Sequence, residues 1–319
     1  MRLLLALLFA LSPAAFATRE VVAPHLRVLY DDPALSEYAQ RAAANAERAL
    51  AALAPLWGPE RERVTLTLDA STDVFNAFAR VLPHPGVTLR PLFPTEDELA
   101  YGARDPLYLL LLHELTHVQQ LNYGALPPGE AGLPDLGLVG EDLAPPPSWF
   151  LEGVATYLES TLATGGRLQD ARTRGLLQSL ALSGRWPTLA EAGLVTFEDW
   201  PGGETRYLLG AAFIDHLVRH YGWDAILATL RAYNARVLTG TFAGAWRQAT
   251  GTSLFEEWDA WHAEIRAAAR ARATNARPGR LLTHTGWSTS GPAVSPDGKH
   301  LAWVSWPPAI RLAELGKDG

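Results

Sequence analysis

The amino-acid sequence predicts an α+β fold, with a strand-rich first part, a helical second half and a short β segment at the C-terminal end. Three observations support this prediction. Before residue 95, runs of β type lie on either side of an Ala-rich amphipathic stretch. Between residues 105 and 274, most segments have the length and the apolar spacing of helices. After residue 275, Gly, Ser and Thr replace Ala, and the apolar runs become short.

Residues 1–17, MRLLLALLFALSPAAFA, have the pattern of a secretory signal peptide. Arg2 provides the positive charge, residues 3–11 form the apolar run, and Ala15-Phe16-Ala17 fits the small-residue cleavage site. The alternative is a membrane anchor, but the run is shorter than the ~20 residues that cross a bilayer. We therefore expect cleavage after Ala17, no stable membrane insertion afterwards, and a periplasmic or secreted location.

The composition indicates a globular protein with a large core, since 48% of the 319 residues are hydrophobic and 19% are charged. The formal net charge of -7, without a basic cluster, argues against a nucleic-acid partner. The chain has no cysteine, so disulfide bonds do not stabilise the fold. The oligomeric state is not predicted.

The first part of the chain is predicted to form strands around one long helix. Strands are expected at residues 25–32 and 63–71, the helix at residues 33–56, and a further extended run at residues 86–94.

A very apolar helix is predicted at residues 105–122, where Asp105 and Pro106 are typical of an N-cap and a first helical turn. The Pro- and Gly-rich residues 123–148 follow, as either a surface connection or the wall of a cleft. Further helices are expected at residues 148–163, 169–182, within 200–222, 223–237 and 254–274.

The stretch LLHELTHVQQ contains His113, Glu114 and His117 in the order H-E-x-x-H. Residues four apart project from one face of a helix, so both imidazoles can bind one metal ion. Glu114 lies beside the pair, where its carboxylate can act as a general base on a water molecule. The motif also occurs by chance, but burying these polar groups among leucines is costly without a metal or hydrogen bonds.

A catalytic zinc ion has three protein ligands and an open fourth position, so one ligand must come from elsewhere in the chain. His117 is not followed by the third histidine of H-E-x-x-H-x-x-G-x-x-H, which excludes a metzincin. The candidate is Glu152, in WFLEGVATYLES on the next predicted helix.

HELTH followed by WFLEGVATYLE resembles the gluzincin metallopeptidases, which include thermolysin and the zinc aminopeptidases, and in particular the bacterial peptidase-MA-like domains that precede TolB-like propellers. Residues 71–94, 185–193 and 206–222 are also similar to that group. The resemblance implies a thermolysin-like gluzincin domain over residues 18–277, with a mixed sheet and helices followed by a helical half. It implies one Zn2+ bound by His113, His117 and Glu152, with Glu114 as the base.

A domain boundary is predicted near residue 277, and PAVSPDGKHLAWVS after it reads as a hairpin with a Pro-Asp-Gly turn. This stretch resembles the blade repeat of TolB-like and dipeptidyl-peptidase-IV-like β-propellers. Residues 278–319 are therefore expected to be a partial propeller segment, since one blade of ~40 residues cannot close a propeller.

Two further residues have predicted roles. Glu159 lies two turns after Glu152 on the same helix face, so it can hold the tautomer of a ligand histidine; the alternative is a solvent-facing glutamate. Tyr207 resembles the gluzincin tyrosine that stabilises the oxyanion, and the alternative is a buried structural tyrosine. His216 and His220 are also four residues apart, but no acidic residue follows His216 at the position that Glu114 has after His113, so a structural or exposed role is favoured.

The sequence departs from the better-known gluzincins in two places. The interval between His117 and Glu152 is longer than usual, because it includes the Pro- and Gly-rich loop. Leu151 stands where the zinc aminopeptidases have an asparagine, which weakens an assignment of aminopeptidase specificity.

The first functional hypothesis is a secreted zinc peptidase acting on a peptide or protein substrate. Zn2+ would polarise the scissile carbonyl, Glu114 would take and return the proton, and Tyr207 would bind the oxyanion. A second hypothesis is a zinc-stabilised binding module that presents a propeller to envelope proteins, and a third is a structural domain without metal. A scaffold does not need a base beside the metal, so Glu114 favours the peptidase.

Overall fold

The structure is a computed structural model that describes residues 18–59, 62–72, 76–81, 84–91, 103–123, 145–196, 199–235, 240–274, 289–305 and 309–314. The predicted signal peptide and most of the predicted loop at residues 123–148 lie outside the described residues. The chain divides into two compact units, Met1–Ala269 and Arg270–Gly319.

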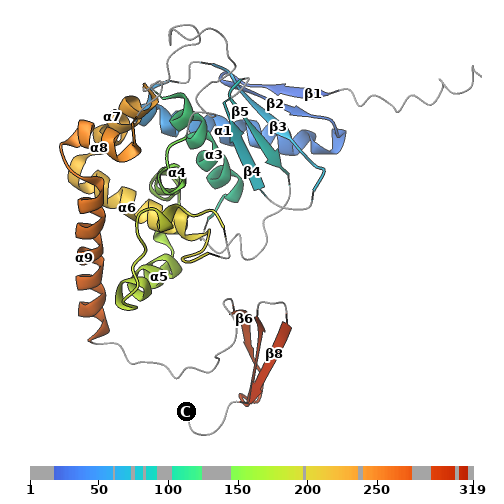
Figure 1. The fold of residues 1–319 in the computed structure, drawn as a ribbon. Helices are drawn as coiled ribbons and strands as arrows, with labels where there is room; N and C mark the ends of the chain where they lie inside the picture. The colour runs from blue at the N-terminus through green and yellow to red at the C-terminus, as the bar shows by residue number, and fades with distance from the viewer. Residues whose placement is uncertain are drawn as a thin grey trace, which may run out of the picture. The chain divides into compact units, whose positions relative to one another are not determined.

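The first unit contains a mixed five-stranded sheet with the strand order β1-β2-β3-β5-β4 (Figure 1). Strands β2, β3 and β5 are parallel to one another, and the edge strands β1 and β4 are antiparallel to their neighbours. The five strands are β1 Arg19–Val22, β2 Leu26–Tyr30, β3 Val64–Leu68, β4 Asn76–Arg80 and β5 Gly86–Arg90. The three predicted strands are confirmed as β2, β3 and β5.

The two edge strands were not predicted. Strand β4 has the sequence NAFAR, which lacks β-branched residues and therefore gives a weak strand signal. Its position depends on pairing with β5, in which Ala79 lies opposite Val87.

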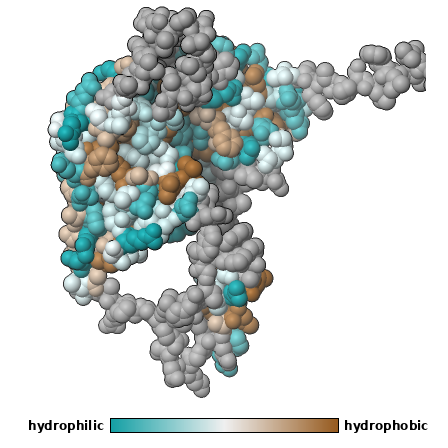
Figure 2. All heavy atoms as spheres, in the orientation of Figure 1, coloured by the Kyte–Doolittle hydropathy of each residue, from teal (hydrophilic) through white to brown (hydrophobic). Residues whose placement is uncertain are grey.

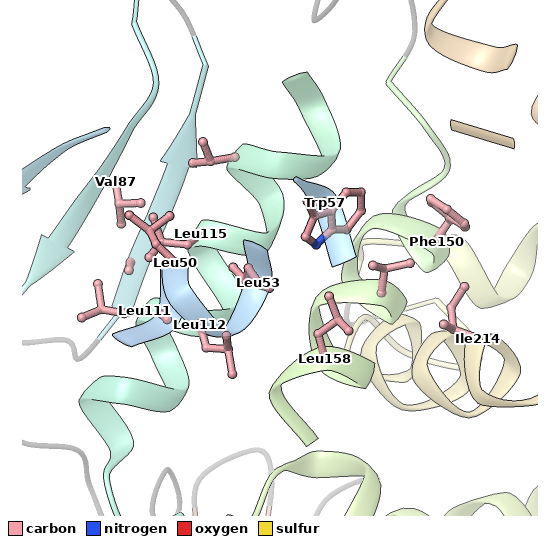
Figure 3. Close-up of a cluster of buried hydrophobic side chains, with 14 of the residues drawn as sticks. Leu50, Leu53, Trp57, Val87, Leu111, Leu112, Leu115, Phe150, Leu158 and Ile214 are labelled. Atoms are coloured by element: carbon pink, nitrogen blue, oxygen red, sulfur yellow. The ribbon is translucent and has the colours of Figure 1, made fainter. Parts of the chain in front are cut away.

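Helices α1 (Ser36–Trp57) and α3 (Pro106–Asn122) pack against each other and against the sheet. Asp105 is the N-cap of α3, as predicted, because its side chain accepts a hydrogen bond from the backbone N–H of Tyr108. Figure 3 shows leucines of α1 and α3 around Val87 of β5, and the same core continues to Phe150 and Ile214 in the helical half. The motif helix α3 is thus held between the sheet and the helices that follow.

The second half of the first unit is helical, as predicted. Among the described α-helices of this half, only α8 was not predicted, and with 9 residues it is the shortest of them. The helices are α4 Ser148–Leu162, α5 Ala171–Leu182, α6 Thr205–Tyr221, α7 Trp223–Asn234, α8 Phe242–Thr250 and α9 Leu254–Ala273.

Helices α4 and α6 approach each other so closely that their backbones touch at Gly153 and Gly210. A Cβ atom built on Gly153 would lie 2.5 Å from the carbonyl carbon of Gly210. The pair brings the helix that carries Glu152 directly against the helix that carries Tyr207.

The second unit contains an antiparallel three-stranded sheet, in which the predicted hairpin is confirmed as β6 (Thr289–Val294) and β7 (His300–Ser305). At the turn, Asp297 Oδ1 accepts a hydrogen bond from the backbone N–H of Lys299. Strand β8 (Ala309–Glu314), which was not predicted, pairs with the other side of β7. The described residues of the second unit form one small sheet and no propeller, so the propeller remains a prediction.

The described surface in Figure 2 is mostly hydrophilic or intermediate, with the hydrophobic residues in small separate patches on the face shown. Among the described residues, none of the helices combines the length and the hydropathy needed to cross a membrane.

Candidate metal centre

His113, His117 and Glu152 are brought together at the contact between α3 and α4. The Nε2 atoms of the two histidines are 3.2 Å apart, and Glu152 Oε2 lies 3.3 Å from each of them. These residues form a group that could hold a metal ion, with all three potential ligand atoms close together.

The triangle formed by these three atoms has the dimensions of a zinc site. In a tetrahedral zinc site with bonds of 2.0–2.1 Å, the ligand atoms are about 3.3 Å apart. The observed separations of 3.2 and 3.3 Å agree with this value. Two imidazoles and one carboxylate are also a donor set that zinc accepts, so the residues present fit the metal.

Glu159 contacts Nδ1 of His113, the ring nitrogen that does not face the metal position. Its Oε2 atom is 2.9 Å from Nδ1 of His113, and because a carboxylate only accepts hydrogen bonds, Nδ1 carries the proton. In neutral His113 this leaves the lone pair on Nε2, which faces the metal position. Glu159 is 1% exposed and is therefore not the solvent-facing glutamate of the alternative interpretation.

Arg167 keeps Glu159 in place and was not found from the sequence. Its Nη1 atom lies 3.0 Å from Glu159 Oε2, and its backbone N–H also donates to Glu159 Oε1. Burial alone would raise the pKa of Glu159, but the charge of Arg167 and the hydrogen bond with His113 lower it below its usual value. Arg167 begins the short 3-10 helix η2 (Arg167–Gln169), just after α4.

Gln120 holds the second histidine and was also missed. Its Nε2 atom donates to the carbonyl of Leu151 at 3.1 Å, which turns its Oε1 atom toward His117 Nδ1 at 2.9 Å. His117 Nδ1 therefore donates, and the lone pair of the neutral ring is on Nε2. The spacing of three residues between His117 and Gln120 on one helix was a signal that could have identified this pair.

Glu114 is buried, with 7% of its surface exposed, and lies outside the triangle of ligand atoms. Burial raises its pKa above the ordinary value, although both histidines oppose this shift. Its carboxylate accepts a hydrogen bond from the backbone N–H of Ala79 in the edge strand β4. Glu114 is therefore a partly desolvated carboxylate that interacts both with the sheet edge and with the two histidines.

Tyr207 lies beside the ligands, with its ring centroid 6.0 Å from that of His113. Its hydroxyl accepts a hydrogen bond of 3.0 Å from Nη2 of Arg206. Burial, and then the charge of Glu152, raise the pKa of this hydroxyl, so it remains a proton donor at neutral pH. Arg206 was not found from the sequence, and its Nε atom lies 3.7 Å from Oε1 of Glu152.

In the metal-free protein, the group formed by His113, His117 and Glu152 carries a proton on His113. Burial alone would lower the pKa of His113, but hydrogen bonds to Glu152 and Glu159 raise it to about 9. Burial would raise the pKa of Glu152, but hydrogen bonds from the two histidines lower it well below its usual range. Protonated His113 thus lies between two carboxylates in the metal-free protein.

We expect the zinc affinity of the metal-free protein to increase with pH from about 6.5 to about 9, because zinc must displace the proton on His113. The stability of the metal-free fold has the opposite pH dependence. The stabilisation from protonated His113 is complete below the unfolded pKa of 6.5 and is lost as the pH rises through about 9. Calorimetry in buffers of different ionisation enthalpy should detect the release of about one proton per zinc at pH 7.5. A pH-independent affinity over this range would contradict the prediction.

The second histidine pair does not form a comparable group. His216 is buried, and its Nδ1 atom is 3.0 Å from Glu264 on α9. His220 packs against it and bonds to its backbone carbonyl through Nδ1. The contact with Glu264 connects α6 to α9, which agrees with a structural role for His216.

Comparison with known proteins gives one kind of match. No protein-family model and no curated protein matches the chain. Among solved structures, the chain is similar to a mutant of an M1 zinc metallopeptidase from Deinococcus radiodurans, with 17% identity and a TM-score of 0.42. The match covers 84% of this chain and 53% of that chain, so this chain spans about half the length of the M1 structure. At this similarity, the interpretation of the site rests on its own geometry.

Proposed function

We propose that this protein is a zinc-dependent peptidase that acts outside the cytoplasm on peptide or protein substrates. The observation that carries the proposal is the triangle of His113 Nε2, His117 Nε2 and Glu152 Oε2, with the buried carboxylate of Glu114 beside it. The extracytoplasmic location rests on the signal-peptide pattern of residues 1–17.

One zinc ion held by His113, His117 and Glu152 would supply Lewis-acid polarisation of a carbonyl group and would make a water molecule more acidic. Glu114 takes the proton of the attacking water and returns it to the leaving amine. Its burial suits both steps, because a raised pKa makes a carboxylate a better base and its acid form a usable donor. The Tyr207 hydroxyl donates to the developing oxyanion.

Glu159 and Gln120 contribute by fixing the ligands. Each holds one histidine through Nδ1, at 2.9 Å, so neither ring needs to reorient when a metal binds. Arg167 neutralises Glu159, which keeps this buried carboxylate ionised as an acceptor.

The proposal is tested by metal analysis together with cleavage profiling against a quenched-peptide library. We expect one zinc per chain, cleavage that a chelator removes, and recovery when zinc is added back. His117→Ala should lose zinc and cleavage, whereas the matched variant His220→Ala, on α6 and outside the ligand group, should keep both. One bound zinc without cleavage of any peptide would favour the zinc-stabilised binding module, and a chain without zinc would favour the structural domain.

A further inference from the structure

Arg206 makes contacts that tie two parts of the site together. It lies in the first turn of α6, immediately before Tyr207, and its side chain is 15% exposed. Its Nη2 atom donates to the Tyr207 hydroxyl at 3.0 Å, and its Nη1 atom donates to the carbonyl of Val195 at 3.3 Å. The Val195 contact anchors the guanidinium, so its remaining edge has a defined direction.

The remaining N–H group of the guanidinium, on Nε, faces Glu152. Arg206 Nε lies 3.7 Å from Glu152 Oε1, whereas Oε2 of the same carboxylate faces the two histidines. The two oxygens of Glu152 therefore have different neighbours. Arg206 Nε is buried and has no hydrogen-bond partner among the described residues, so a small approach of Oε1 would satisfy it.

The hydroxyl contact decides where the Tyr207 proton can point. A guanidinium has only donors, so the Tyr207 oxygen accepts from Arg206, and its own hydrogen must point away from that contact. Two positive charges also lie close to the ring, since the guanidinium carbons of Arg206 and Arg167 are 4.7 and 4.9 Å from its centroid.

We propose that Arg206 is a positioning residue that couples the third metal ligand to the oxyanion donor. One guanidinium holds Oε1 of Glu152, which leaves Oε2 for the metal, and orients the Tyr207 hydroxyl so that its proton is available to the substrate. The inference rests on the proposed function, but its zinc-binding half is independent of turnover.

The experiment compares Arg206→Gln, Arg206→Lys, Tyr207→Phe and the double variant Arg206→Gln/Tyr207→Phe with the parent, all as the full chain. The matched control is Arg219→Gln on the same helix, where Arg219 is half exposed and pairs with Asp215 and Glu264. Zinc dissociation constants are measured by competition with a chromophoric chelator, and kcat and KM with the best peptide from the library. Thermal unfolding of each variant monitors the fold.

We expect Arg206→Gln to weaken zinc binding by about 10-fold, in the range of other groups that hold a ligand, and to lower kcat with little change in KM. Arg206→Lys keeps the charge but not the forked donor, so it should recover more of the zinc affinity than of kcat. Tyr207→Phe should leave zinc affinity unchanged. In the Tyr207→Phe background, Arg206→Gln should still weaken zinc binding but lower kcat less than in the parent.

The proposal is overturned if Arg206→Gln binds zinc and cleaves peptide as the Arg219→Gln control does. If Arg206→Gln does not fold, a folded Arg206→Lys with the zinc affinity and kcat of the parent overturns it equally. If the parent binds zinc but cleaves no peptide, the proposed function fails; weaker zinc binding by Arg206→Gln would then still support the coupling to Glu152. A parent that binds no zinc removes both.

Discussion

Glu114→Gln is expected to lower kcat/KM for peptide hydrolysis by at least about 100-fold, since general-base catalysis contributes typically 10²–10⁴-fold. Glutamine has nearly the same shape as glutamate but cannot take the proton of the attacking water. Glu114 is outside the His113–His117–Glu152 triangle, so zinc content should not change. Measurement of zinc per chain and of kcat/KM on the same preparation checks both halves of the prediction.

The fold of the Glu114→Gln variant should be intact for a local reason. The glutamine side-chain oxygen can still accept the hydrogen bond from the backbone N–H of Ala79 in β4. Glu256→Gln, an exposed position on α9, is the matched control and should keep full activity. If Glu114→Gln cleaves peptides as fast as the parent, Glu114 is not the base and the proposed mechanism is wrong.

Gly210→Ala is expected to destabilise the protein by about 1–3 kcal/mol, which is the usual cost of overpacking. The added Cβ would lie 2.2 Å from the carbonyl oxygen of Trp149 and 2.9 Å from Cα of Gly153. Both contacts are with the backbone of α4, which cannot rotate away as a flexible side chain can. We expect the thermal unfolding temperature to fall by roughly 2–12 °C.

The close approach of α4 and α6 should also affect zinc affinity. Gly153 directly follows Glu152, so separating α4 from α6 moves a ligand as well as a helix, and Gly153→Ala should weaken zinc binding together with stability. The matched control is Gly175→Ala in α5, where a Cβ meets nothing within 4 Å. That substitution should be neutral or stabilising by up to ~1 kcal/mol, because Ala is the better helix former. Equal stability changes in Gly210→Ala and Gly175→Ala would refute the close-packing argument.

Local patterns in the sequence were sufficient to predict most helices and strands and the placement of His113 and His117 on one helix face. Asp105 and Pro106 marked the start of α3, and the four-residue spacing of His113 and His117 placed both on one face of it. The Pro-Asp-Gly turn predicted the hairpin of β6 and β7. These features depend on residues within a few positions of each other, so helix periodicity, capping and turn chemistry carry them.

Strands and contacts that depend on distant parts of the chain were not predictable in this way. Strand β4 forms because β5 offers it a partner, and its Ala79 N–H then reaches Glu114 on α3. No local sequence pattern indicated that Arg206 would face Glu152, because an arginine before a tyrosine at the start of a helix is not a recognisable motif. The packing of α6 on α4 decides that contact.

By itself, the sequence determined that two imidazoles and a base share one helix, and it pointed to Glu152 on the next helix as the third ligand. Only the tertiary structure decided that the three ligand atoms lie 3.2 to 3.3 Å apart, and that Glu159, Gln120, Arg167 and Arg206 surround them. The physical reason is that the periodicity of a helix determines which of its residues share a face, whereas the distance between two helices depends on the residues packed between them. Here that separation is set in part by two glycines, Gly153 and Gly210, whose missing side chains let the backbones of α4 and α6 touch.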